Sequence, residues 1–86
     1  MDFQANTELF DAINSLKEEL ASFGKNGASS SLENGMRGLN GLTDGWAYLL
    51  EHLELVKSKY GSLLTSQQYE RLAKIQSEVH RIVYRA

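Results

Sequence analysis

Residues 60–69 have the sequence YGSLLTSQQY, and this stretch separates two strongly predicted helices. Gly61 is suited to end the first helix, because glycine is a poor helix former that is common just after helix ends. Thr65 and Gln68 have the spacing of a capping box, in which each side chain accepts a hydrogen bond from the backbone N–H group of the other residue. The stretch therefore predicts a tight connection between two antiparallel helices.

Apolar residues recur every three or four positions on both sides of this connection. The preceding helix, predicted over 43–60, carries Trp46, Leu49, Leu50, Leu53, Val56 and Tyr60. The following helix, predicted over 66–85, carries Leu72, Ile75, Val79 and Ile82. Such spacing places the apolar side chains on one face of an α-helix, which is then buried against other helices.

A third helix is predicted near the N-terminus, over residues 6–23, with the apolar stripe Leu9, Ile13, Leu16, Leu20 and Phe23. Gly24 is suited to end this helix, because glycine adopts a positive φ without steric cost. The chain is therefore predicted to be all-α, a small antiparallel bundle of three main helices at about 6–23, 43–60 and 66–85.

The glycine-rich segment 24–42 is the most ambiguous part of the chain. Residues 25–31 are rich in Gly, Asn and Ser, which is typical of a loop. Ser30 and Glu33 have capping-box spacing, which favours a short extra helix after them. Closely spaced glycines oppose a long helix here, since each costs about 0.8–1 kcal/mol relative to alanine. We expect a loop or a short helix, with a break near Asn40–Gly41.

Length and composition bound the remaining possibilities. With 86 residues, the chain is expected to form a single helical domain, 1–86, with a thin core. It contains no cysteine, which excludes disulfides, cysteine-based metal sites and thiol nucleophiles. Its apolar runs are too short to cross a membrane. These features predict a cytoplasmic protein without a membrane partner.

Charge is unevenly distributed along the chain. Residues 1–55 carry nine acidic and three basic side chains, a net charge of −6, whereas residues 56–86 carry two acidic and six basic side chains, a net charge of +4. The simplest interpretation is that the two halves pack together and complement each other. The alternative is a basic surface for nucleic acid or a membrane.

Side chains that could carry chemistry are scarce. His52 is followed by Leu55 and Val56 at the positions where a second metal ligand would share its helix face, and His80 is the only other histidine. The glycines match neither phosphate-binding motif. We therefore predict that the protein is not an enzyme and has no catalytic residue, metal, cofactor or small-molecule substrate.

Three groups of residues outside the apolar stripes are candidates for binding a partner. The first lies on the 43–60 helix, roughly opposite its stripe, and comprises Tyr48, His52 and Leu55. The second is a largely basic row along the last helix, with Arg71, Lys74, Arg81 and Arg85. The third is a patch near the C-terminus that comprises His80, Val83 and Tyr84.

These surfaces favour a non-enzymatic protein–protein interaction module, such as a small adaptor, chaperone or inhibitor. Such a module presents a helix face to another protein or to a second copy of itself. The alternative is a small nucleic-acid-binding regulatory protein that uses the basic face of the last helix. An isoelectric point of about 5.6 and the acidic first half oppose this alternative, because both repel a polyanion.

Overall fold

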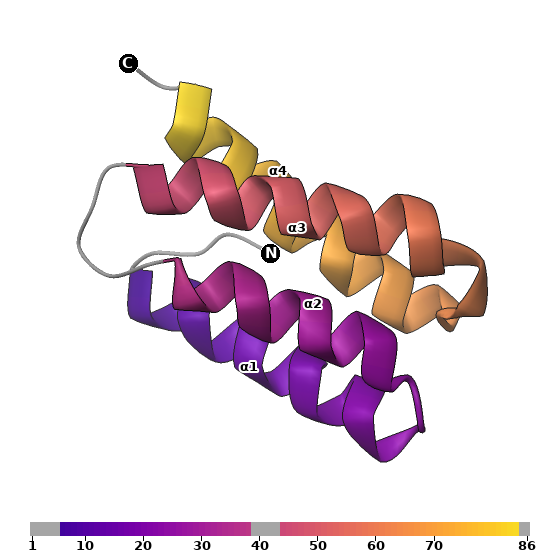
Figure 1. Ribbon diagram of the computed structural model, residues 1–86. Helices are drawn as coiled ribbons and strands as arrows, with labels where there is room; N and C mark the ends of the chain where they lie inside the picture. Colours follow the sequence, from indigo (N-terminus) through magenta and orange to yellow (C-terminus); the bar gives the residue numbers. More distant parts are fainter. Residues whose placement is uncertain (1–5, 39–43, 85–86) are drawn as a thin grey trace.

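The computed structural model describes residues 6–38 and 44–84, and these form four α-helices (Figure 1). The helices are α1 (Asn6–Ser22), α2 (Asn26–Arg37), α3 (Asp44–Tyr60) and α4 (Ser66–Tyr84), and a 3₁₀ turn, η1 (Gly61–Leu63), precedes α4. The described residues contain no strand. The predicted all-α class is therefore confirmed.

The four helices form an up-and-down bundle in which each helix runs antiparallel to the next (Figure 1). α2 packs against α1 and α3, and α4 packs against α3 and α1, which closes the bundle. Its extents are 35 × 24 × 21 Å. Because every helix has two neighbours within the chain, each can bury an apolar face.

The core is built from the apolar stripes of all four helices. Its buried members are Leu9, Ile13, Leu16, Leu20, Ala28, Leu32, Leu49, Leu50, Leu53, Val56, Leu72, Ile75 and Val79. Phe23 was predicted to belong to the first stripe, but its side chain is 59% exposed. The reason is that α1 ends at Ser22, so Phe23 already belongs to the turn.

The turn after α1 reverses the chain at Gly24, whose φ is +79°. The N–H group of Lys25 donates to the carbonyl oxygen of Leu20 (2.8 Å), and that of Gly24 donates to Ala21 (3.0 Å). These two bonds form a Schellman motif, which satisfies carbonyl groups left free at the end of the helix. The predicted role of Gly24 is confirmed.

The largest departure from the sequence prediction is α2. Residues 26–37 form a twelve-residue helix, so the expectation of a loop over 25–31 is wrong, and the bundle has four helices rather than three main ones. The predicted cap at Ser30 is also wrong, because α2 begins further upstream. Its N-cap residue is Lys25, which makes no side-chain capping bond.

Packing against α3 explains why this glycine-rich segment is helical. Gly27 lies beside Tyr60, Gly35 beside His52, and Gly38 beside Tyr48. The missing side chains let the two helices approach closely, and the tertiary contact outweighs the low helix propensity of the segment. The predicted break near Asn40–Gly41 lies outside the described residues.

The connection between α3 and α4 has the predicted form. The N–H group of Gln68 donates to Thr65 Oγ1, and the N–H group of Thr65 donates to Gln68 Oε1, both over 3.1 Å. The capping box is therefore confirmed. α3 ends at Tyr60, directly before Gly61, as predicted.

Candidate interaction surface

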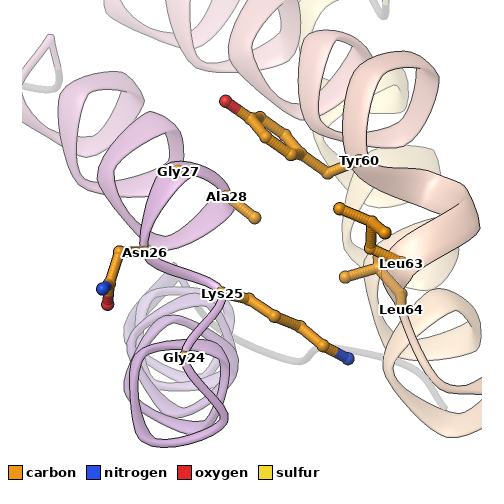
Figure 2. A pocket seen from close by; sticks show the side chains of 8 residues that line it. All are labelled: Gly24, Lys25, Asn26, Gly27, Ala28, Tyr60, Leu63 and Leu64. Carbon is orange, nitrogen blue, oxygen red and sulfur yellow. The ribbon is translucent and has the colours of Figure 1, made fainter.

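The α1–α2 turn and the α3–α4 connection face each other at one end of the bundle, across a cavity of about 150 Å³ (Figure 2). One side of the cavity is formed by the turn and the first residues of α2, and the other by the end of α3 and η1. Its lining residues are Gly24, Lys25, Asn26, Gly27, Ala28, Tyr60, Leu63 and Leu64. The side chains of Ala28, Tyr60 and the two leucines make this lining largely apolar.

Large apolar side chains are exposed at the same end. Phe23 is 59% exposed, Leu63 61% and Tyr69 39%. Phe23 adjoins the cavity residue Gly24, Leu63 lines the cavity itself, and the Tyr69 ring lies against Gly61. Single exposed apolar residues are common on protein surfaces, whereas clusters of them are typical of interaction sites.

Three lysines accompany these apolar side chains. The Nζ atoms of Lys25, Lys57 and Lys59 lie 5.6, 5.7 and 5.5 Å from the centroids of the Phe23, Tyr69 and Tyr60 rings. None of the three forms an ion pair with a carboxylate of the described residues. We call this surface the basic end; it comprises the cavity with Phe23, Leu63, Tyr69, Lys25, Lys57 and Lys59.

The α3 group predicted to bind a partner has a neighbour within its own chain. Gly35 of α2 lies against His52, and Gly38, directly after α2, lies against Tyr48. The rings of these two α3 residues are 4.4 Å apart. Tyr48 and Leu55 each remain 44% exposed. Because α2 covers part of this face, it does not require a second copy of the chain to cover it.

In the basic row on α4, the three cations that the structure describes each form an ion pair with a carboxylate of the same chain. Arg71 donates to Glu19 Oε1 of α1 (2.7 Å), and Lys74 Nζ lies 3.3 Å from Glu70 Oε1. Arg81 donates two bonds to Glu78, of 2.8 and 2.6 Å. Arg85 lies outside the described residues. These pairs reduce the positive potential that phosphate groups would meet.

The C-terminal patch lies at the opposite end of the bundle from the basic end. The rings of His80 and Tyr84 are 4.5 Å apart, and Tyr84 is 69% exposed. Here the structure brings two predicted residues together.

The sequence prediction assigned none of the residues of the basic end to the binding of a partner. A signal was present for two of them: Phe23 directly precedes Gly24, the predicted end of the helix, and Leu63 lies in the predicted connection. Side chains at such positions leave the core stripe. For Lys25, Lys57 and Lys59 the decisive fact is the lack of an acidic partner, and the sequence carries no signal for that.

Glu19 ties α1 to α4 beside the basic end. Its carboxylate accepts hydrogen bonds from Gln68 Nε2 (2.9 Å) and from Arg71 (2.7 Å). These two bonds, helped by the positive charges of Arg71 and Lys25, hold the pKa of Glu19 below its ordinary value of 4.5. The folded protein therefore favours the charged form of this side chain.

Acidification is expected to weaken the fold through Glu19. Because its pKa is lower in the folded chain, the stabilisation is present above pH 4.5 and is lost as the pH falls through the folded-state pKa. Urea unfolding at near-neutral and acidic pH measures this loss. Glu19→Gln is expected to lose less stability on acidification than the unmodified chain, whereas the exposed control Glu18→Gln should follow the unmodified chain. Equal losses in all three proteins would contradict this role.

Other kinds of site find no support in the part of the chain that the structure describes. No group of three or more His, Asp or Glu side chains there could hold a metal ion, and no helix there is long and apolar enough to span a membrane. Comparisons of the chain with protein-family models, with curated proteins and with solved structures find no match.

Proposed function

We propose that the protein is a non-enzymatic protein–protein interaction module and that the basic end is its binding surface. One observation carries the proposal: an apolar cavity, exposed Phe23 and Leu63, and lysines without acidic partners coincide at one end of the bundle. Protein interfaces combine apolar anchors near the centre with a polar rim. The cavity and the lysines of the basic end have this arrangement.

A different protein is a better candidate partner than a second copy. In a complex of two copies, the basic end of one copy would have to meet exposed acidic residues of the other. These lie outside the basic end, on α1 and α3: Asp11, Glu18, Glu51 and Glu54. Contact between two different patches is heterologous and builds rings or open chains rather than a closed dimer. Concentration-dependent assembly in sedimentation experiments would favour the second copy instead.

Two matched leucine variants test where the binding surface lies. Leu63→Ser removes an apolar side chain from the basic end, and Leu55→Ser removes one from α3. Both leucines lie at the surface, with 61% of Leu63 and 44% of Leu55 exposed, so both variants should fold. Peptides selected from a random library on the unmodified protein should bind Leu63→Ser at least tenfold more weakly, because burying a leucine contributes about 1.5–3 kcal/mol.

The same peptides should bind Leu55→Ser with an affinity within about twofold of the unmodified protein, equivalent to less than about 0.5 kcal/mol. A loss confined to Leu55→Ser would move the binding surface to the Tyr48–His52–Leu55 group on α3. A library that yields no binder at all would remove the proposal.

A further inference from the structure

We propose that the partner of the basic end is an acidic peptide segment that inserts one aliphatic side chain into the cavity between the α1–α2 turn and η1. This inference rests on the proposed function and adds the chemistry of the partner to it. Two independent observations support it, one of charge and one of shape.

The observation of charge is that the unpaired cations gather in one place. Five cations of the described residues lie within 4 Å of a carboxylate: Lys17, Arg37, Arg71, Lys74 and Arg81. The three that have no such partner, Lys25, Lys57 and Lys59, all belong to the basic end. Of these, Lys25 donates to Gln68 Oε1 (2.8 Å), so Lys57 and Lys59 supply most of the charge that is left without a partner. The neighbouring carboxylates are already engaged, Glu19 by Arg71 and Glu70 by Lys74. The basic end therefore presents positive charge that an acidic partner would complement.

The observation of shape is that the exposed apolar side chains surround a recess. Ala28, at 1% exposure, lies at the buried side of the cavity, and Figure 2 shows Tyr60 and Leu63 facing the start of α2 across it. A volume of about 150 Å³ is enough for a group the size of benzene, and so for one leucine, isoleucine or methionine side chain. Lys25 also lines the cavity, so a cation lies directly beside the apolar recess.

A peptide fits these observations better than an anionic membrane does. Proteins that insert into the membrane interface present protruding apolar side chains over a broad face, whereas the centre of the basic end is a cavity. A recess flanked by lysines instead matches a single anchor side chain with acidic neighbours.

The composition of selected peptides is the first test. Peptides enriched from a random library on the unmodified protein should carry net negative charge and share one aliphatic residue. If the enriched peptides were neutral or basic but still bound Leu63→Ser more weakly, the proposal of an acidic partner would be wrong. The proposal that the basic end is a binding surface would still stand. A library without any binder would overturn both.

Matched charge variants provide the second test. Lys57→Gln/Lys59→Gln removes two cations without an ion pair from the basic end, and Arg37→Gln/Arg81→Gln removes two cations whose carboxylate partners, Glu33 and Glu78, lie away from it. The tightest selected peptide should bind the first variant at least fivefold more weakly and the second within twofold of the unmodified protein, measured by fluorescence anisotropy. The affinity should also fall as salt is raised. Equal effects of the two variants would contradict a local role of the basic end.

A double-mutant cycle tests the inserted side chain. The peptide anchor is changed to serine, and Leu63 of the protein is changed to serine, singly and together. If the anchor contacts Leu63, the two losses should be clearly less than additive; independent losses would place the anchor elsewhere. Phosphatidylglycerol vesicles serve as the competing surface, and binding to them that disappears in Lys57→Gln/Lys59→Gln would assign the basic end to lipid and overturn the proposal.

Discussion

Replacing Gly35 by valine is expected to lower the free energy of unfolding by about 2–3 kcal/mol. A Cβ atom on Gly35 would lie 2.9 Å from His52 Cβ and 3.1 Å from Leu49 Cδ1. His52 Cβ is attached directly to the backbone of α3 and cannot rotate away, so α2 and α3 would have to separate. The better helix propensity of valine offsets less than about 1 kcal/mol of this loss.

A neighbouring substitution separates packing from propensity. Asn34 is exposed on α2, so Asn34→Ala should leave the unfolding free energy unchanged or raise it by up to about 0.5 kcal/mol. Gly35→Ala should lie between the two, because its clash opposes a propensity gain of about 1 kcal/mol. Chemical denaturation followed by circular dichroism measures all three. A Gly35→Val protein as stable as the unmodified chain would show that α2 and α3 do not depend on this close contact.

Gln68→Ala is expected to lower the free energy of unfolding by a similar amount, about 2–3 kcal/mol. The side chain of Gln68 is fully buried. Its Oε1 atom accepts hydrogen bonds from Lys25 Nζ (2.8 Å) and from the Thr65 N–H group (3.1 Å), and its Nε2 atom donates to Glu19 (2.9 Å). Alanine would leave these three groups without that partner, empty a buried volume and remove half of the capping box.

The adjacent glutamine is a matched control for this prediction. Gln67 is exposed, and Gln67→Ala should change the unfolding free energy by less than about 0.5 kcal/mol. Gln68→Glu tests the donor side separately, since it keeps an acceptor for Thr65 but replaces the amide that faces Glu19 with an oxygen. Guanidinium denaturation should therefore place Gln68→Glu below the unmodified chain. If Gln67→Ala and Gln68→Ala were equally stable, Gln68 would not join the helices as described.

The parts of the fold that could be predicted are those with local causes. Thr65 and Gln68 cap α4 through bonds three residues apart, and Gly24 ends α1 through its own φ. The apolar stripes follow from helical spacing, and their members are buried or, for Trp46, Tyr60 and Ile82, partly buried against the core. Phe23 is the exception, because a stripe alone does not show where its helix ends.

α2 could not be predicted, because its causes are not local. Gly27 and Gly35 are poor helix formers in isolation, yet they are the residues that allow contact with Tyr60 and His52. The basic end has the same difficulty, since it depends on which cations find partners across the bundle. Arg71 forms an ion pair with Glu19 on α1. Only this long-range ion pair distinguishes Arg71 from the lysines of the basic end, which have no carboxylate partner.

The even number of antiparallel helices has a consequence for how the protein can be attached to other molecules. Asn6 and Tyr84 lie at the same end of the bundle, the one away from the basic end (Figure 1). A helix such as α1, with 17 residues, spans about 26 Å, and this length separates the two ends. A group attached in the first turn of α1 or in the last turn of α4 is therefore held about one helix length away from the basic end. Labels at these two positions would report on the distance to a bound partner without touching it.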